Sequence, residues 1–239
     1  MTIEILPLGD RAILVNFQQI IDPTVHQQVI GLSGKLEHAS IEGVTFILPA
    51  YCSLTIGYNP EKAKYQDLNH NIRTLYKQPL KSQKVSGARL TLPVCYEEPF
   101  ALDMFEISKF TGLKPEEIIN IHTAQSYSVY MLGFLPGFPY LGILPEALHC
   151  SRKVNPRMRV PERSIGIAGQ QTGIYPWESP GGWNIVGNTP LPIFDPQRAT
   201  PFLFKVGDLV NFKAINKSEY QRIEADIRNE NFSWDSING

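Results

Sequence analysis

The chain has 239 residues and a formal net charge of −1, from 22 basic and 23 acidic residues. This balance gives no overall field that attracts nucleic acid or an anionic membrane, so we expect neither partner. Hydrophobic residues make up 43% and charged residues 19%, which is typical of a folded globular protein and excludes a disordered chain.

The first part of the chain, residues 1–87, predicts strands that alternate with amphipathic helices. Strand, helix, strand, strand, helix is the order expected of a ferredoxin-like α/β sandwich. Residues 78–87 are polar and fit a connector to a second domain. The expected elements are strands at 12–17, 44–48 and 54–58, a helix opened by Asp22 and Pro23, and a helix opened by Asn59 and Pro60.

The second part, residues 88–239, predicts a closed or nearly closed β-barrel. Residues 133–201 hold 9 of the 18 glycines and 11 of the 19 prolines, which excludes long helices and favours short strands joined by turns. The fold class is therefore α+β. The expected elements are strands at 89–94, 164–168, 183–186, 192–194, 203–206 and 208–212, a helix ended by Gly112, a helix opened by Pro115, a helix at 217–227, and a frayed tail at 229–239.

Familiar catalytic motifs are missing from the sequence. It contains no GxxxxGK[ST] or GxGxxG phosphate loop, no GxSxG and no HExxH. The three cysteines are odd in number and far apart, which favours a reducing cytoplasm over a disulfide framework, and we expect no metal site. We find no signal peptide and no membrane span.

Three segments carry unusual chemistry. GFLPGFPYLG, residues 133–142, combines three aromatic residues with a backbone that we do not expect to form regular structure. NPRMRVPER, residues 155–163, offers guanidinium groups for an anion, and IAGQQTGIYPWESPGGW, residues 167–183, offers amides and a hydroxyl on a glycine-rich backbone. Each also has a purely structural interpretation as a barrel plug, a solvated loop or a barrel corner. His122, four residues after Ile118 on one helix face, taken alone fits a core residue better than a catalyst.

These segments resemble, in order and spacing, the family of 5-oxoprolinase B subunits. The same family has been called allophanate hydrolase subunit 1, and it includes the sporulation-kinase inhibitor KipI. The resemblance extends from LPLGDRAILVNF near the start through SPGGWNIVGNTP and LPIFDP, and so covers nearly the whole chain. It implies a ferredoxin-like domain followed by a cyclophilin-like β-barrel.

The resemblance also implies an activity. The B subunit pairs tightly with a C subunit. This pair works with an A subunit to open 5-oxo-L-proline to L-glutamate at the expense of ATP, with Mg²⁺ expected beside the nucleotide. The isolated chain is expected to be inactive. A KipI-like kinase inhibitor and an allophanate-hydrolysing component of urea breakdown are the alternatives, and prolyl isomerase activity is disfavoured because a fold does not fix a function.

The resemblance places the expected site on three polar residues and an apolar wall. His122 would transfer a proton or polarise the substrate, Arg157 would face an anionic group, and Gln171 would be a third polar member. We expect the three segments to close around one cleft. The residues expected to bind substrate are Phe134, Pro136, Gly137, Phe138, Tyr140, Gly169, Thr172, Tyr175 and Trp183.

Overall fold

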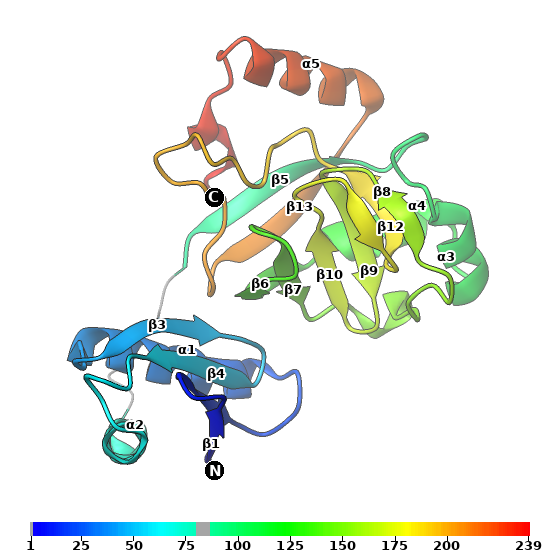
Figure 1. Cartoon of the computed structure of the whole chain (residues 1–239). Coiled ribbons are helices and arrows are strands. Elements are labelled where there is room, and N and C mark those ends of the chain that lie inside the picture. The colour runs from blue at the N-terminus through cyan, green and yellow to red at the C-terminus, as the bar shows by residue number, and fades with distance from the viewer. Residues whose placement is uncertain (1, 80–86) are drawn as a thin grey trace. The chain divides into compact units, whose positions relative to one another are not determined.

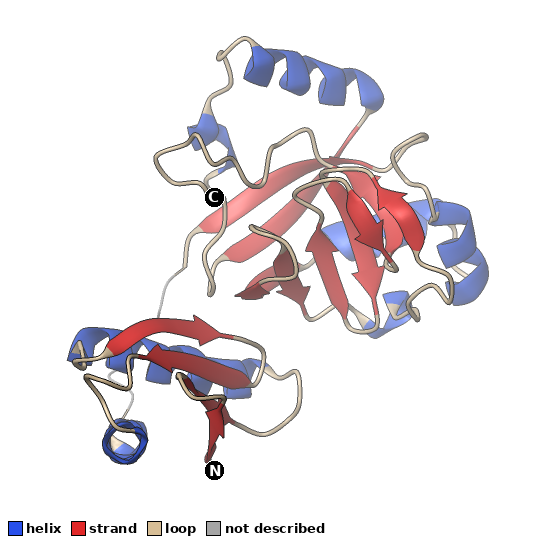
Figure 2. Ribbon diagram, in the orientation of Figure 1, coloured by secondary structure: helices blue, strands red, loops and turns tan. Residues whose placement is uncertain are grey.

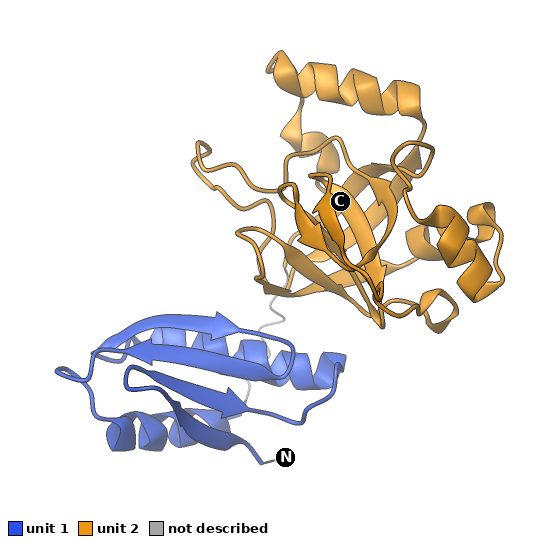
Figure 3. Cartoon of the chain, turned by 45° about the vertical axis from the view of Figure 1, so that its right-hand side comes forward, with its two compact units in different colours: residues 1–86 blue, residues 87–239 orange. Residues whose placement is uncertain are grey.

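A computed structural model describes residues 2–79 and 87–239 of the chain. The chain divides into two compact units, residues 1–86 and 87–239, one residue away from the expected boundary (Figure 3). Each unit has a hydrophobic core of its own. The connector predicted at 78–87 lies outside the described residues except at its ends.

The N-terminal unit is a four-stranded antiparallel sheet with two helices (Figure 1). Its strand order is β1-β2-β4-β3, so the N-terminal strand forms one edge and pairs with β2 through a tight hairpin. This edge strand was missed in the sequence. The ferredoxin-like assignment stays a prediction. The elements are β1 (Glu4–Leu8), β2 (Ala12–Asn16), α1 (Pro23–Ala39), β3 (Val44–Pro49), β4 (Ser53–Tyr58) and α2 (Tyr65–Lys77).

The two helix starts predicted in this unit had different outcomes. Asp22 is confirmed as the N-cap of α1, because its carboxylate accepts hydrogen bonds from the backbone N–H groups of Thr24 and Val25 at 2.8 and 3.1 Å. The start predicted at Asn59 is wrong. The carbonyl of Asn59 accepts from Lys62 and the residue after it, which closes a turn, and α2 begins only at Tyr65.

The C-terminal unit is a closed barrel of seven strands, as the sequence predicted (Figure 2). Its strand order is β10-β7-β6-β13-β5-β12-β9, and closure pairs every one of these strands on both sides. A separate antiparallel pair, β8 with β11, makes a second small sheet. The strands are β5 (Arg89–Cys95), β6 (Ser126–Leu132), β7 (Pro139–Gly142), β8 (Arg157–Val160), β9 (Ser164–Ala168), β10 (Gln171–Ile174), β11 (Ser179–Gly181), β12 (Asn184–Asn188) and β13 (Leu209–Ile215).

Side chains on the two faces of the barrel wall belong to different cores. Ile165 and Ile167 of β9 point inward and are fully buried in the main core. Gly166 between them points outward, where a Cβ would lie 3.0 Å from Trp183 and 3.4 Å from the ring of Tyr175. Alternation along the strand therefore places the aromatic residues on the outer face of the wall.

Several strand predictions in the glycine- and proline-rich region need correction. Residues 192–194 and 203–206 are loops, and an isolated bridge pairs Phe194 with Phe202, the residue before the second range. GFLPGFPYLG does contain a regular strand, since its last four residues form β7 between β6 and β10. Strands β6, β8, β10 and β11 were not predicted.

Helices of the C-terminal unit begin and end at the predicted signals. Gly112, at φ 74°, ends the first, and Pro115 is the first residue of the second. The predicted fraying of the tail is wrong, because Ile237 is buried and Asn238 bridges to Leu90 of β5. The elements are α3 (Met104–Thr111), α4 (Pro115–Thr123), η1 (Glu146–Leu148), α5 (Lys217–Arg228) and η2 (Trp234–Ile237).

We expect replacement of Asn216 by alanine to destabilise the C-terminal unit by about 1 kcal/mol. The Asn216 side-chain oxygen accepts the Glu219 backbone N–H at 2.8 Å and caps α5. All three tryptophans lie in this unit, so denaturant unfolding followed by tryptophan fluorescence reports on it alone. Asn216→Asp keeps the cap and is the control. Equal loss of stability in both variants would argue against a capping role.

Candidate functional site

Five of the residues expected to bind substrate form one aromatic cluster on the outer face of the barrel. Phe138 of the loop before β7 is its centre, with ring centroids 4.8 Å from Tyr140, 5.1 Å from Tyr175 and 5.6 Å from Trp183. Phe134 packs edge-on against Phe138 at 5.7 Å. We call these five residues the aromatic cluster. The rings of Phe138, Tyr175 and Trp183 are buried, so only Phe134 and Tyr140 present substantial surface to a ligand.

The loop that carries Phe134 is held in a strained shape. Phe134 is 61% exposed and has φ 65°, in the left-handed region that bulky residues rarely adopt. Hydrogen bonds from Gly133 N to Phe138 O (3.1 Å) and from Leu135 N to Gly133 O (2.8 Å) close the loop. Gly137 has φ 83°, and a Cβ there would lie 2.7 Å from Phe194, so a side chain is excluded. Pro136 is exposed at the tip.

Arg157 begins β8 and binds a buried carboxylate. Asp103, which is fully buried, accepts hydrogen bonds from the guanidinium of Arg157 (2.5 Å), from the ammonium of Lys153 and from the backbone N–H of Ile185 (2.8 Å). Burial raises the pKa of Asp103, but the bonds from Arg157, Ile185 and Lys153 outweigh it and hold that pKa below its usual value. Asp103 therefore stays ionised and fixes both cations.

These cations lie beside the aromatic cluster. Arg157 is paired in register with Gly181 of β11, two residues before Trp183, and the backbone N–H of Lys153 donates to Gly182 at 2.7 Å. The guanidinium of Arg152 lies 5.8 Å from the centre of the Trp183 ring and makes no ion pair with any described residue.

His122 lies on the other face of the barrel wall. It is fully buried inside the barrel, stacked on Phe212 at 4.7 Å, and burial lowers its pKa to about 3. Its Nδ1 is 2.8 Å from the Tyr96 hydroxyl, and its Nε2 is 3.1 Å from the hydroxyl of Thr172. Thr172 in turn donates to the Gly166 carbonyl at 3.1 Å, so its hydroxyl accepts from His122. This series of hydrogen bonds fits a neutral imidazole that carries its proton on Nε2.

The β9–β10 hairpin separates His122 from the aromatic cluster. Thr172 of β10 points inward to His122, whereas a Cβ on the next residue, Gly173, would lie 2.9 Å from the Phe138 ring outside. Gln171 is half-buried at the start of β10, opposite Ala168, and Gly169 makes the turn at φ 56°. The structure thus brings Arg157 and the aromatic rings to one side of the wall, and His122 with Thr172 to the other.

Sequence reasoning missed the residues that organise the charges. Arg152 and Lys153 stand just before the predicted arginine segment, which begins at Asn155, so extension of that segment by three residues would have included them. Asp103 carries no local signal, because its partners lie about 50 residues away. The catalytic and binding roles themselves stay predictions.

The described residues contain no cluster of three or more histidine, cysteine or acidic side chains arranged to hold a metal ion. His149 and Cys150, adjacent in sequence, have separate partners: His149 is 2.8 Å from the Leu144 carbonyl, and the Cys150 sulfur accepts from Asn184. Burial raises the pKa of the Cys150 thiol to about 11. Within the same residues, every helix is too short or too polar to cross a bilayer.

Comparison with known proteins gives the family. A profile described as "Carboxyltransferase domain, subdomain C and D" matches residues 3–204. The B subunit of 5-oxoprolinase from Bacillus subtilis is 36% identical over 227 residues, which cover 91% of this chain and 95% of that protein. The chain belongs to the family of 5-oxoprolinase B subunits. The resemblance to 5-oxoprolinase B subunits found in the sequence is confirmed.

Two further relatives are longer proteins, and this chain matches only part of each. The crystal structure of TTHA0988 matches with a TM-score of 0.77 and 33% identity over 86% of this chain, which spans 40% of that chain. A putative urea carboxylase of Emericella nidulans is 25% identical over 202 residues, 71% of this chain and 16% of that protein. Regions similar to this chain therefore also occur within longer polypeptides.

Proposed function

We propose that the chain is the B subunit of an ATP-hydrolysing 5-oxoprolinase, which opens 5-oxo-L-proline to L-glutamate together with A and C subunits. The observation that carries the proposal is the match to the 5-oxoprolinase B subunit of Bacillus subtilis, which extends over 95% of that protein. The name of that relative implies a complex of several subunits, so a single chain is expected to hold only part of the site.

The charges beside the aromatic cluster support an anionic ligand. Lys153 and Arg157 share a single buried carboxylate, Asp103, and Arg152 lies over Trp183 without an acidic partner among the described residues, so this surface keeps an excess of positive charge. Such groups suit the carboxylate of 5-oxoproline or the phosphates of ATP, with Mg²⁺ brought by the nucleotide. ATP supplies the activation of the lactam, because phosphorylation of its carbonyl oxygen makes a poor electrophile a good one.

The chain's own residues would bind and orient the substrate. Arg157 is held by Asp103, so its direction is fixed before an anion arrives. Phe134 and Tyr140 would cover the ring of the substrate and exclude water, and Gln171 would hydrogen-bond it from the hairpin end. His122 acts from inside the barrel wall by holding Thr172, so we assign it a positioning role instead of contact with the substrate.

The proposal predicts activity only in the assembled complex. The chain should be purified with candidate A and C subunits, and oxoproline-dependent ATP hydrolysis and glutamate release should be measured for each combination. We expect turnover only when all three subunits are present. Oxoproline-independent hydrolysis of ATP by every mixture would contradict the proposal.

Within that complex, Arg157→Ala is expected to lower coupled turnover by at least about 100-fold, because a buried charge-assisted contact to the ligand is lost. Arg159→Ala is the matched control, since the Arg159 side chain is 82% exposed and bonds only weakly to Glu178 at 3.7 Å. Arg152→Met removes a cation without touching Asp103. Wild-type turnover in both Arg157→Ala and Arg152→Met would contradict the assignment of an anion-binding site to these cations.

A urea-breakdown role is the second candidate, favoured by the 25% identity to the putative urea carboxylase of Emericella nidulans. The same assembled mixture should be offered allophanate in place of 5-oxoproline. Ammonia release from allophanate without oxoproline-dependent turnover would favour this role. A KipI-like role would show as inhibition of sensor-kinase autophosphorylation by the chain alone.

A further inference from the structure

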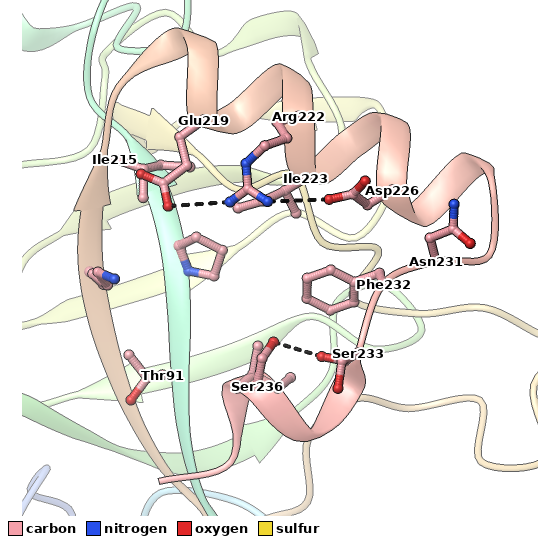
Figure 4. A pocket seen from close by; sticks show the side chains of 13 residues that line it. Thr91, Ile215, Glu219, Arg222, Ile223, Asp226, Asn231, Phe232, Ser233 and Ser236 are labelled. Carbon is pink, nitrogen blue, oxygen red and sulfur yellow. Dashed lines mark hydrogen bonds and ion pairs between the residues drawn. The ribbon is translucent and has the colours of Figure 1, made fainter.

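A cavity lies at the C-terminal end of the chain (Figure 4), and none of its lining residues belongs to the aromatic cluster. Strands β5 and β13 form its floor, α5 forms one wall, and the segment through η2 forms the other. Its volume of about 390 Å³ is within the range of small-molecule sites, which begins near 300 Å³. We call it the C-terminal pocket. It is lined by Thr91, Pro93, Lys213, Ile215, Glu219, Arg222, Ile223, Asp226, Asn231, Phe232, Ser233, Ser236 and Ile237.

The walls of the C-terminal pocket are held in place by contacts outside it. The backbone N–H of Gly239 donates to the Arg89 carbonyl at 2.8 Å, beside the bridge from Asn238 to β5. Arg198 stacks over Trp234 at 4.2 Å. On the other wall, the Tyr220 hydroxyl donates to Asn188 at 2.9 Å. The pocket is therefore preformed, and a ligand need not order it on binding.

Charges of both signs line the pocket in balance. Arg222 lies between Glu219 (3.8 Å) and Asp226 (3.4 Å) along α5. Lys213 on the floor makes no ion pair with any described residue. A polyanion such as a nucleotide would meet the two carboxylates, and a polyamine would meet the two cations. A ligand with one charge of each sign fits both sets.

The remaining surface suits a small molecule with an apolar part. Ile223, Phe232 and Ile237 offer apolar surface between the charged groups. Thr91 and Ser233 add hydroxyls on the opposite side from α5, where they can donate to a carboxylate. A carboxylate near Lys213 and an ammonium near Glu219 would leave the side chain of the ligand on this apolar surface.

We propose that the C-terminal pocket binds a free α-amino acid. The carboxylate of the ligand is bound by Lys213 and the hydroxyls, and its ammonium by Glu219 and Asp226. This site goes beyond the proposed oxoprolinase function, since most of its lining lies after residue 204, where the family match ends. It also gives a role to the C-terminal tail, residues 229–239, which the sequence predicted to be frayed.

Isothermal titration of the full chain with L-glutamate, L-glutamine and L-leucine tests the site. At least one amino acid should bind, and the matched acid without the ammonium (glutarate for glutamate) should bind at least about tenfold more weakly. The matched amine without the carboxylate (isoamylamine for leucine) should also bind at least about tenfold more weakly. These losses are expected because Arg222 offsets only one of the two carboxylates on α5, so glutarate leaves one negative charge uncompensated, whereas isoamylamine leaves the ammonium of Lys213 without a partner.

Two variants connect binding to the pocket. Lys213→Met and Glu219→Gln should each weaken binding of the amino acid at least tenfold. Lys217→Met changes another exposed lysine, which lies outside the lining, and should leave binding unchanged. Tryptophan-monitored unfolding checks that the variants fold, and Thr91→Val is the substitute if one does not. The proposal is overturned if no amino acid binds, if inorganic phosphate alone binds, or if Lys213→Met binds like the wild type. Because the titration uses this chain without partners, failure here is distinct from failure of the oxoprolinase assay.

Discussion

Replacement of Asp103 by alanine is expected to lower the free energy of unfolding of the C-terminal unit by about 3 kcal/mol. The carboxylate is fully buried and joins the start of α3 to β12, to the first residue of β8 and to the segment before β8. Its loss leaves the Ile185 N–H without its acceptor and leaves two cations uncompensated. We expect the lower end of the range for a broken buried pair, because the Lys153 and Arg157 side chains remain 21% and 28% exposed.

Denaturant unfolding followed by tryptophan fluorescence measures this change in the C-terminal unit. Glu178→Ala is the matched control, because it removes a carboxylate whose pair with Arg159 is exposed and 3.7 Å long. It should change stability by less than about 0.5 kcal/mol. A loss for Asp103→Ala as small as that of the control would show that the buried pair contributes little.

Acid is expected to destabilise the C-terminal unit through His122, in the range between pH 6.5 and about 4.5. Burial lowers the folded-state pKa of His122 to about 3, so in this range the unfolded chain takes up a proton that the folded chain does not. The free energy of unfolding therefore falls as the pH falls. One such group gives a slope of up to about 1.4 kcal/mol per pH unit.

His122→Gln should flatten this slope, since glutamine does not titrate in this range. Its own loss of stability does not matter, because the measured quantity is the pH dependence and not the stability at one pH. His38→Gln, which changes an exposed histidine of the N-terminal unit, is the control. The protonation of Asp103 has the same sign but falls at lower pH, since its pKa is below the usual value. An unchanged slope in His122→Gln would contradict a buried neutral imidazole.

Local signals in the sequence predicted helix starts and ends well where the capping residue itself sets the boundary. Asp22 with Pro23 begins α1, Gly112 ends α3, and Pro115 begins α4, because capping needs only neighbouring residues. The pair Asn59-Pro60 led to a wrong prediction of a helix start, because the same residue types also form turns. The strand β7 was missed because its ladder depends on β6 and β10, which supply pairing that no local pattern in a proline- and glycine-rich segment reveals.

The candidate site shows the same division. Composition pointed to Phe138, Tyr140 and Trp183, and the structure groups them on one face. His122 precedes these residues in the chain but lies on the opposite face of the wall, and spacing in sequence cannot show that. The role of Asp103 could not be predicted from the sequence, because a buried acid is recognised only by the cations that compensate it, and these are distant in the chain.

The sequence by itself determined the α+β class, the closed barrel in the second half, and the family, because these depend on periodicity, on turn residues and on motifs in fixed order. Only the tertiary structure decided which side chains meet. Strand pairing sets which face of the wall each residue occupies, so neighbours such as Thr172 and Gly173 serve different cores. It also turned a polar tail into one wall of a pocket, because the last residues pair with β5 across about 150 residues of chain.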